Sequence, residues 1–387
     1  MLKSYYNSEK PLTLGILGGG QLAKMLAQEA YRLGINVAII EKEADSPAGD
    51  MTKLEFSKGW LDDDELTRFV DASDIITLEN EFIDSEILER INKTKKVFPS
   101  PETMKLIQDK LIQKQTFQNA GIPVPIFKEL NSSEEAVEFG KQNGFPIVIK
   151  ARKYGYDGYG NATAFNDDEC FKAWERFNNQ SLVRPLFVEA FVNFSKEIAV
   201  MVARNENLEN VVYPCVETIQ YRHICHAVIA PAEIDLSLRK TAQELALKSV
   251  EAINGIGVFG VEMFLTNENQ ILINEIAPRP HNSGHYTIEA CFTSQFENTI
   301  RAVCNLPLGS PDMITPAAAM VNLLGKRNGI GIPDDVTELL RHKKVWVHLY
   351  NKKKSRIGRK MGHITALGTN QPEAMNRAQS AADAIVW

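Results

Sequence analysis

The stretch VEMFLTNENQILINEI, residues 261–276, reads as two β-strands joined by a short turn. Its two apolar segments, 261–266 and 271–276, are separated by four polar residues, which is typical of an antiparallel hairpin. If Thr266 pairs with Ile271, Glu262 lies directly opposite Glu275, with the two Cβ atoms about 5 Å apart. The hairpin therefore predicts two carboxylates on one face of an antiparallel sheet.

Opposed glutamates need a physical explanation, because like charges placed directly opposite each other destabilise a sheet. One carboxyl could carry a proton, as in hydrolases that use paired acids. Alternatively, a divalent cation lies between them, and Mg²⁺ favours one or two carboxylates together with phosphate oxygens. We favour the metal, and a shifted register that leaves both glutamates in solvent is the structural alternative.

The segment KARKYGYDGYGN, residues 150–161, supplies the second candidate site. Lys150 ends an expected strand over 147–151, and three closely spaced glycines follow it. Glycines let backbone N–H groups approach phosphate oxygens without a Cβ in the way, and a strand lysine can place its charge on the same phosphates. The segment predicts a lid over a nucleotide, with a solvated hairpin tip as the alternative.

The first hundred residues alternate between expected strands and helices, which predicts a parallel sheet wrapped by helices. Gly18-x-Gly20-x-x-Ala23 opens the first helix, 21–33, and Glu41 closes the next strand, 36–40. This spacing fits the dinucleotide fingerprint, but such loops also hold other phosphates at a helix N-terminus. The pattern alone leaves a nicotinamide or flavin site and a plain tight turn both open.

After Pro99-Ser100-Pro101 the pattern changes from parallel to antiparallel. We expect one helix over 102–119, and neighbouring strands with short turns imply antiparallel pairing. The expected strands are 147–151, 162–165, 186–192, 197–204, 258–266 and 271–276, with helices over 238–253 and 373–385. The fold class is therefore α/β in the first part of the chain and α+β in the rest.

The composition is that of a globular protein and excludes several classes of function. Of 387 residues, 44% are hydrophobic and 24% are charged, which rules out a disordered or fibrous chain. A net charge of −6, and no apolar run near the roughly 20 residues of a membrane helix, lead us to expect no nucleic-acid and no membrane partner. Five dispersed cysteines and no signal peptide suit the cytoplasm.

A basic segment stands out in this acidic chain. Between Glu338 and Glu373 there are nine Lys and Arg residues and no acidic residue. Arginines placed just before Gly362-His363 would suit a small phosphate ester, because guanidinium groups bind phosphate oxygens in pairs. A solvated face and a nucleic-acid contact are the alternatives.

The stretch NEIAPRPHNSGHYT, residues 274–287, together with TSQF at 293–296, closely resembles the signature of the N5-carboxyaminoimidazole ribonucleotide synthetases. These are ATP-grasp enzymes of de novo purine biosynthesis. GYDG at 155–158, GGGQL at 18–22 and RIGRKMGH at 356–363 also match, so the resemblance runs from about residue 13 to about residue 368. It implies a Rossmann-like pre-ATP-grasp domain without a dinucleotide, an ATP-grasp domain of antiparallel sheets, and a small C-terminal domain. The expected boundaries are 1–101, 102–312, with a lid subdomain at about 125–192, and 313–387.

The resemblance implies an ATP-dependent carbon–nitrogen ligase. Such an enzyme joins bicarbonate to the amine of 5-aminoimidazole ribonucleotide through carboxyphosphate and yields N5-carboxyaminoimidazole ribonucleotide, ADP and phosphate. It further implies Mg²⁺ on Glu262 and Glu275, with Mn²⁺ as the alternative metal, in a cytoplasmic homodimer. Three rival readings remain: the formate-using glycinamide ribonucleotide transformylase of the same pathway, a nicotinamide-dependent oxidoreductase, and a nucleotide-sensing module.

The resemblance also assigns roles to individual residues. The catalytic residues are expected to be Asp157, Tyr156, Lys150 and His281. The ATP site is expected to comprise Lys110, Lys150, Gly155, Tyr156, Asp157, Gly158, Tyr159, Gly160, Asn161, Glu189, Ala190, Phe191, Val192, Glu197, Gln220, Asn274 and Glu275. The aminoimidazole ribonucleotide and bicarbonate are expected at Gly20, Gln21, Glu79, Asn282, Arg301, Lys353, Arg356 and Arg359. The chain departs from the family pattern at Phe82, Tyr154 and Gln220, the last of which replaces a family histidine.

Overall fold

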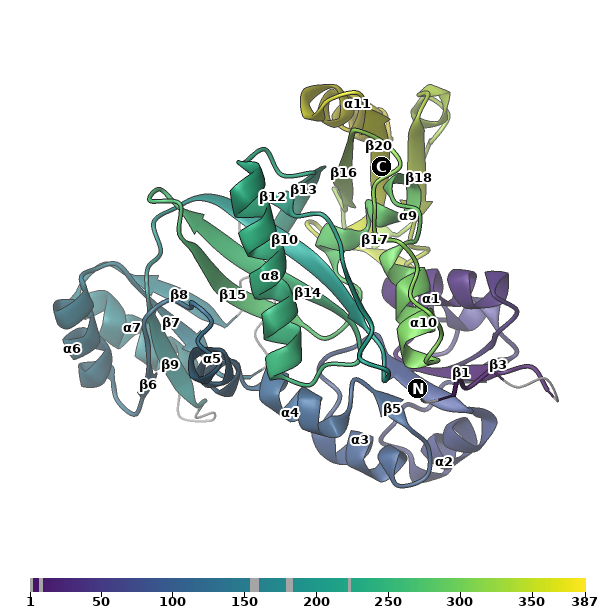
Figure 1. Ribbon diagram of the computed structural model, residues 1–387, viewed down its shortest axis with the longest axis horizontal. Coiled ribbons are helices and arrows are strands. Elements are labelled where there is room, and N and C mark those ends of the chain that lie inside the picture. The colour runs from purple at the N-terminus through teal and green to yellow at the C-terminus, as the bar shows by residue number, and fades with distance from the viewer. Residues whose placement is uncertain (1–2, 7–9, 154–159, 179–183, 222–223) are drawn as a thin grey trace.

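The computed structural model describes residues 3–6, 10–153, 160–178, 184–221 and 224–387. Figure 1 shows three regions side by side: a small sheet with α6 and α7, a large central sheet crossed by α8, and an N-terminal region of short strands and helices. The C-terminal strands stand above the N-terminal region in the same view. Within the described ranges, no helix is long and apolar enough to cross a membrane.

The N-terminal region is a five-stranded sheet with the order β3-β2-β1-β4-β5, and every pair in it is parallel. Strands β1, β2 and β4 are almost wholly buried, as expected for a parallel sheet covered on both faces. The predicted parallel sheet is thereby confirmed. Its elements are β1 (Thr13–Leu17), α1 (Gln21–Arg32), β2 (Asn36–Ile40), η1 (Gly49–Met51), β3 (Leu54–Phe56), α2 (Asp63–Ala72), β4 (Ile75–Leu78), α3 (Ser85–Asn92) and β5 (Val97–Phe98).

The single helix expected over 102–119 is wrong, because the chain breaks at Asp109. Two helices form instead, α4 (Pro101–Gln108) and α5 (Lys110–Asn119). Asp109 has extended backbone angles, and its carboxylate accepts the N–H groups of Leu111 and Ile112, which caps α5. The same carboxylate binds Arg152 at 2.6 Å. The break makes Lys110 the first residue of α5.

The small sheet is antiparallel with the order β6-β9-β7-β8. Helices α6 and α7 contact each other and pack against it (Figure 1). Its elements are β6 (Phe127–Leu130), α6 (Ser133–Asn143), β7 (Ile147–Ala151), β8 (Asn161–Ala164), α7 (Asp167–Phe177) and β9 (Leu186–Ala190). The hairpin predicted around the glycine-rich segment is present as β7 and β8, which pair Lys150 with Asn161.

The large sheet is antiparallel and runs through β15-β14-β10-β12-β13-β16-β20-β18, with β11 on the side of β10. Alternate residues of β10 serve two cores: Ile198, Val200 and Val202 pack with α8, and Ala199 and Met201 face the other side. Its first part comprises β10 (Phe194–Arg204), β11 (Asn210–Val212), β12 (Val216–Tyr221), β13 (Ile224–Ala230), α8 (Leu236–Ala252), β14 (Gly257–Thr266) and β15 (Ile271–Ala277).

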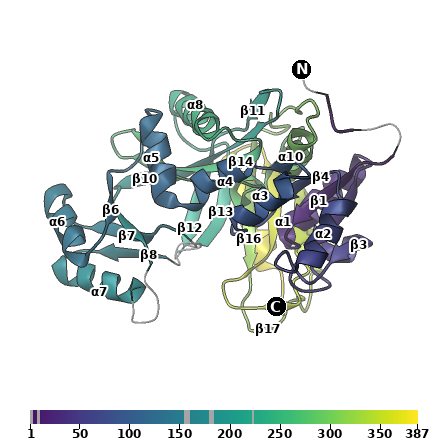
Figure 2. The same ribbon diagram turned by 90° about the horizontal axis from the view of Figure 1, so that it is seen from below.

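The same sheet continues into the C-terminal region, where α11 covers β16 and β20. The later elements are η2 (Asn282–Gly284), α9 (Thr287–Ala290), α10 (Gln295–Val303), β16 (Ala317–Leu324), β17 (Gly329–Ile330), η3 (Leu339–Arg341), β18 (Val345–Leu349), β19 (Lys354–Ser355), β20 (Lys360–Gly368) and α11 (Gln371–Asp383). Strands β17 and β19 form a separate two-stranded sheet. Figure 2 shows from below that β17 lies on the side of the molecule away from α8.

The register of β14 and β15 differs from the prediction near the turn. Leu265, not Thr266, pairs with Ile271, and the register shifts between Glu262 and Met263. The shift leaves Asn274 as one extra residue in β15 and brings Glu275 opposite Glu262. The predicted pairing of Thr266 is therefore wrong, whereas the predicted opposition of the two glutamates is confirmed.

Candidate active site

A cleft opens to solvent between the loop after β4, the α4–α5 break and the end of β15. Its ionisable lining includes Glu81, Lys110, Lys153, Glu275, Arg279 and His281. Phe82, which departs from the family pattern, forms part of its wall with Ile107. The cleft thus joins one end of the predicted metal pair to residues of the long signature motif.

The opposed glutamates have pKa values shifted in opposite directions. Burial raises the pKa of Glu262 to about 8, with the charges of Glu275 and Glu197 adding to the effect. Burial acts the same way on Glu275, but Lys110, whose Nζ lies 2.6 Å from Glu275 Oε2, and Lys150 bring its pKa down to about 2. The protein alone therefore relieves the repulsion by favouring a proton on Glu262. A divalent cation beside the pair would favour both ionised forms.

Two lysines share one buried carboxylate behind this pair. Lys150 Nζ lies 2.5 Å from Glu189 Oε2, and Lys114 Nζ lies 2.9 Å from Glu189 Oε1. Lys150 also reaches Asn274 Oδ1 at 3.5 Å. Burial lowers the pKa of Lys114 to about 8, despite the neighbouring Glu189. The side chain of Glu189 therefore acts as a counter-ion for two lysines.

The expected adenine contacts lie at the end of β9. The Ala190 N–H donates to the carbonyl of Ile126, so this donor is already used. Phe191 and Val192 follow the strand, and Phe191 is exposed. The backbone groups of the residues after Ala190 thus lie outside the sheet ladder, where they could hydrogen-bond to an adenine base.

Glu197 belongs to the same acidic group as the opposed pair. It lies on β10, between Thr218 of β12 and Phe264 of β14. Burial raises its pKa to about 6; a hydrogen bond from Gln220 lowers it, and the charge of Glu275 raises it. The structure therefore brings the predicted residues Glu197, Gln220 and Glu275 together.

Arg279 is a site residue that the sequence analysis missed, although it lies inside the quoted signature. Its Nη2 donates to Glu81 Oε1 at 2.9 Å, which joins the end of β15 to the loop after β4. The neighbouring His281 has Nε2 at 3.5 Å from Glu262 Oε1 and Nδ1 at 2.8 Å from Ser283 Oγ. Burial, then the charges of Arg279 and Lys360, lower the pKa of His281 to about 3, so its imidazole is neutral.

Carboxylates close the glycine turn at the start of α1. Glu79 accepts the N–H groups of Gly20 at 3.0 Å and Ala23 at 3.3 Å, and Gly19 donates to Glu41 at 2.9 Å. Burial raises the pKa of Glu79, and these backbone hydrogen bonds oppose the shift. Because Glu41 binds its own glycine turn, the dinucleotide interpretation gains no support here. Gln21, the first residue of α1, follows the same turn.

The basic segment lies against the N-terminal region. Lys353 Nζ lies 2.9 Å from Asp45 Oδ2, and Lys24 of α1 donates to the Leu349 carbonyl at 3.1 Å. Arg356 is exposed, and burial together with the charge of Arg356 lowers the pKa of Arg359. These contacts bring the two halves of the predicted ribonucleotide site, the glycine turn and the basic segment, to the same side of the molecule.

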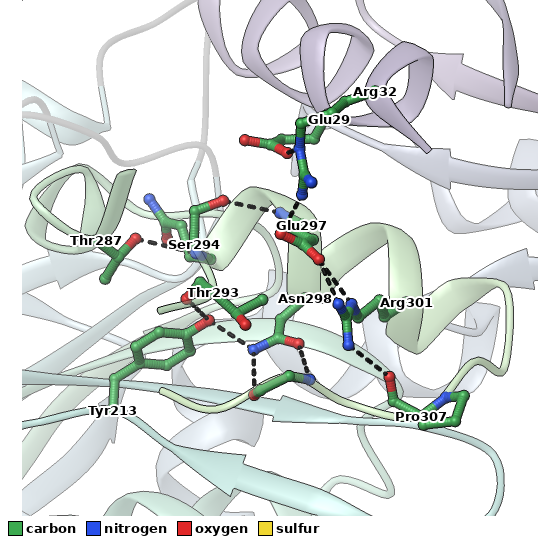
Figure 3. A network of polar contacts seen from close by, with 12 residues as sticks. Glu29, Arg32, Tyr213, Thr287, Thr293, Ser294, Glu297, Asn298, Arg301 and Pro307 are labelled. Atoms are coloured by element: carbon green, nitrogen blue, oxygen red, sulfur yellow. Dashed lines mark hydrogen bonds and ion pairs between the residues drawn. The ribbon is translucent and has the colours of Figure 1, made fainter. Parts of the chain in front are cut away.

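Arg301, predicted to contact the substrate, has a carboxylate and a backbone carbonyl of the protein as its partners. It lies on α10, where Nη2 binds Glu297 Oε1 at 2.5 Å and Nη1 donates to the Pro307 carbonyl (Figure 3). Glu297 also contacts Arg32 of α1. Because Glu297 lies one helical turn before Arg301, the guanidinium is held along α10 and joins a contact between two domains.

The predicted lid is described only in part. Gly155, Tyr156, Asp157, Gly158 and Tyr159, like Tyr154, lie outside the described residues. Gly160 is described: it has φ of +99°, and its carbonyl accepts the Ala151 N–H at 2.8 Å, which closes the hairpin.

The donors around the opposed pair fit a magnesium ion that is shared with a nucleotide. Among the residues that the structure describes, no group of three or more His, Cys, Asp or Glu side chains could hold a metal by itself. Glu262, Glu275 and Asn274 offer only oxygen donors from one side of a hairpin. Mg²⁺ commonly takes one or two carboxylates and completes its shell with phosphate oxygens and water.

Three family models cover most of the chain. The ribonucleotide synthetase preATP-grasp domain matches residues 12–108, and the ATP-grasp domain matches residues 115–296. The phosphoribosylaminoimidazole carboxylase C-terminal domain matches residues 318–377. The pre-ATP-grasp, ATP-grasp and C-terminal architecture is thereby confirmed.

Individual relatives agree with these models. The N5-carboxyaminoimidazole ribonucleotide synthase of Bacillus subtilis is 36% identical, over 93% of this chain and 92% of its own length. The phosphoribosylaminoimidazole carboxylase of Schizosaccharomyces pombe is 41% identical over 97% of this chain, which spans 68% of that longer protein. A solved structure of N5-carboxyaminoimidazole synthase from Aspergillus clavatus, in complex with ADP and 5-aminoimidazole ribonucleotide, has a TM-score of 0.88 at 35% identity and covers 96% of this chain and 98% of its own.

Proposed function

The chain belongs to the family of N5-carboxyaminoimidazole ribonucleotide synthases, and from this premise we propose that it is an ATP-dependent carbon–nitrogen ligase. It joins bicarbonate to the exocyclic amine of 5-aminoimidazole ribonucleotide and forms N5-carboxyaminoimidazole ribonucleotide, ADP and phosphate in de novo purine biosynthesis. The observation that carries this proposal is the opposition of Glu262 and Glu275, the latter in contact with Lys110, beside a cleft that Arg279 and His281 also line. One site thus combines groups for a metal, a triphosphate and a small anion.

The first step is phosphoryl transfer to bicarbonate. A bicarbonate oxygen attacks the γ-phosphorus, the bond to the bridging oxygen of ADP breaks, and carboxyphosphate results. Lys110 and Lys150 would stabilise the negative charge on the phosphates, because both ammonium groups lie beside the acidic pair. Mg²⁺, with Mn²⁺ as the alternative, would be held by Glu262 and Glu275 and would supply further charge neutralisation.

Arg279 and His281 would hold the bicarbonate and the carboxyphosphate. Arg279 supplies planar N–H donors that match a carboxylate, and its ion pair with Glu81 fixes the guanidinium in the cleft. The neutral imidazole of His281 can donate one hydrogen bond and accept another. Together they would orient the anion for attack, which makes the reaction effectively unimolecular.

The second step is attack of the substrate amine on the carboxyl carbon. Its nitrogen forms the new C–N bond, phosphate leaves, and the amine proton passes to a base. We propose Asp157 as that base, with Tyr156 beside it, on the family pattern of the glycine-rich segment. Closure of residues 155–161 over the site would exclude water, which would otherwise hydrolyse carboxyphosphate.

The ribonucleotide would lie between the glycine turn and the basic segment. Gly20, Gln21 and Glu79 would contact the ribose side, and Lys353, Arg356 and Arg359 would bind the phosphate. The ion pair between Lys353 and Asp45 supports this, because it holds the basic segment beside the loop after β2, whose Ala48 N–H donates to the Gly19 carbonyl of the turn. Lys353 would then exchange the carboxylate of Asp45 for the incoming phosphate.

Compartment and assembly are further proposals. All five cysteines are buried and no disulfide joins them, which supports a reducing compartment and hence the cytoplasm. The family pattern supports a homodimer, and sedimentation velocity of the purified chain would test it.

A phosphate-release assay tests the function. With ATP and magnesium, we expect phosphate release that requires both bicarbonate and 5-aminoimidazole ribonucleotide, together with formation of the carboxylated product. A requirement for formate in place of bicarbonate would instead favour the transformylase. Binding of NADH without any binding of ATP would favour an oxidoreductase, for which Gly18, Gly20 and Glu41 supply the only argument.

A further inference from the structure

Gln295, the first residue of α10, hydrogen-bonds the backbone of His281 in both directions. The His281 N–H donates to Gln295 Oε1 at 2.9 Å, and Gln295 Nε2 donates to the His281 carbonyl at 2.8 Å. The side chain of Gln295 is wholly buried. Because a backbone N–H only donates and a carbonyl only accepts, these two contacts fix which end of the amide is oxygen. Gln295 therefore holds His281 as a neighbouring β-strand would.

The remaining contacts leave Gln295 no freedom to turn. Its Nε2 also lies 3.0 Å from His285 Nδ1, and its own backbone N–H donates to Thr287 Oγ1 at 2.9 Å. A Cβ added at Gly284 would lie 2.5 Å from Gln295 Oε1, so the loop packs tightly on the amide. Both hydrogens of the amide and its oxygen are thus engaged by residues 281–285.

A second buried amide holds the next residue from the C-terminal part of the sheet. Asn282 Nδ2 donates to Asn322 Oδ1 at 3.0 Å, and Asn322 Nδ2 donates back to Asn282 Oδ1 at 2.6 Å. Asn322 lies on β16 and also donates to the Cys225 carbonyl on β13 at 2.9 Å. Both asparagines are buried. The amide of Asn282, expected to bind substrate, is therefore engaged by the protein itself.

Gly260 completes the support from the opposite side. A Cβ at this position of β14 would lie 2.5 Å from the Cβ of His281, so the histidine rests directly on the strand that carries Glu262. His281 Nε2 lies 3.5 Å from Glu262 Oε1. The segment that carries Arg279 and His281 is thus held by Gln295, Asn322 and Gly260 against the acidic pair.

We propose that Gln295 and Asn322 are positioning residues for the carboxylation: through the backbone of His281 and the side chain of Asn282, they fix the segment 279–285 beside Glu262 and Glu275. The inference rests on the proposed function for its catalytic consequence, and on the contacts alone for its structural one. Asn282 then acts as a link to the C-terminal sheet, and the C-terminal domain contributes to catalysis as well as to substrate binding.

The structural consequence is tested without any activity. Gln295→Met and Asn322→Leu keep the approximate volume and remove the hydrogen bonds, and Asn322→Ser is a smaller change in case Asn322→Leu does not fold. We expect deuterium uptake across residues 279–285 to rise about tenfold in rate in the variants that fold. Gln243→Met is the matched control. Gln243 lies on α8 and donates to the Tyr213 carbonyl at 3.0 Å, so its replacement should leave the uptake of residues 279–285 unchanged. Unchanged uptake in Gln295→Met and in an Asn322 variant would show that these two side chains do not hold the segment 279–285, whatever the reaction is.

The catalytic consequence is tested by the ratio of phosphate released to carboxylated product formed. In the Gln295 and Asn322 variants we expect kcat to fall about tenfold and the ratio to rise, because misplaced Arg279 and His281 release carboxyphosphate to water. The affinity for ATP should stay within about twofold of the wild-type value, since Lys110 and Lys150 are not held by Gln295 or Asn322. Faster exchange with an unchanged ratio and kcat would reject the positioning role. Wild-type protein without bicarbonate-dependent turnover would instead reject the proposed function and leave the exchange result standing.

Discussion

Glu262 on β14 lies directly opposite Glu275 on β15 because one extra residue, Asn274, shifts the register between them and the turn. The bulge has a second effect, since Asn274 Oδ1 comes within 3.5 Å of Lys150 Nζ. A regular hairpin with the observed turn would place Asn274 opposite Glu262 instead. The local irregularity therefore creates the acidic pair on which the proposed metal site depends.

Replacing Glu275 by Gln should reduce turnover by about 100-fold or more, because the variant loses one metal ligand and the counter-ion of Lys110. The chain should remain folded, since the side chain borders an open cleft. Glu268→Gln, an exposed change in the turn of the same hairpin, is the control. Phosphate release by Glu275→Gln at a rate close to that of Glu268→Gln would contradict the metal assignment, as would full activity of the wild type in excess EDTA.

Replacing Arg356 by Ala should raise the KM for 5-aminoimidazole ribonucleotide about tenfold and leave that for ATP nearly unchanged, because a charge-assisted contact to its phosphate is lost. Arg327→Ala removes a cation of the same domain that pairs with Asp334 at 2.6 Å, and should change neither constant. Steady-state kinetics with each substrate varied in turn measures the two values. An equal rise in both would show that Arg356 does not recognise the ribonucleotide.

Replacing Arg279 by Met should raise the KM for bicarbonate and lower kcat, because the anion loses its planar donor pair. Together these two changes should lower kcat/KM for bicarbonate by about 100-fold. Arg279→Lys keeps the charge but not the fork, and we expect an intermediate value. Glu81→Gln tests the support of the guanidinium, since Glu81 Oε1 lies 2.9 Å from Arg279 Nη2. Variation of bicarbonate at saturating ATP is the measurement. An unaffected bicarbonate KM in all three variants would exclude this residue from the anion site.

Replacing Glu189 by Gln should destabilise the protein by about 3 kcal/mol near neutral pH, because Lys114 then loses its carboxylate in a buried site. The pKa of Glu189 is lowered to about 2 against an ordinary value of 4.5, since the two lysines outweigh its burial. The unfolded chain therefore takes up this proton first, and the contribution of Glu189 is complete above about pH 4.5 and lost as the pH falls toward 2.

The difference in urea midpoint between wild type and Glu189→Gln should thus shrink as the pH is lowered from 5 toward 3. Glu129→Gln breaks the more exposed ion pair with Arg152 on the same small sheet, and should cost less than about 1 kcal/mol at every pH. A difference for Glu189→Gln that is independent of pH would mean that the pKa of this carboxyl is the same in the folded and the unfolded chain, so that the two lysines do not lower it.

The sequence predicts this molecule well where periodicity and short turns decide the structure. The opposition of Glu262 and Glu275 was predicted from a register that the structure does not have, and the bulge at Asn274 restores it. The parallel sheet of β1, β2 and β4 and the β7–β8 hairpin follow from alternation and spacing alone. The turn register does not, because a bulge at Asn274 leaves the hydrophobic pattern of 271–276 almost unchanged. The break at Asp109 is also hidden, since the carboxylate that caps α5 is bound by Arg152, 43 residues away in sequence.

The residues of the site were predicted less completely than the fold. Neither Lys114 nor Arg279 was predicted, although Arg279 lies inside the quoted signature, because their roles depend on burial and on partners from other elements, Glu189 and Glu81. Arg301 shows the reverse case: a motif residue whose charge is already neutralised by Glu297 on its own helix. Short-range sequence patterns identify which polar residues matter, whereas long-range contacts decide what each of them does.

The backbone ladder between β13 and β16, from Ala227 with Val321 to Ala230 with Ala318, crosses the boundary at which the family models divide the chain. Cutting the polypeptide there would remove one neighbouring strand from each of β13 and β16. Each would become an exposed, largely apolar edge strand, which can pair with other molecules and aggregate. Splitting the gene before the last 70 or so residues, or inserting a removable affinity tag there, should therefore not be tolerated. A truncated product should precipitate and should not remain as a smaller enzyme.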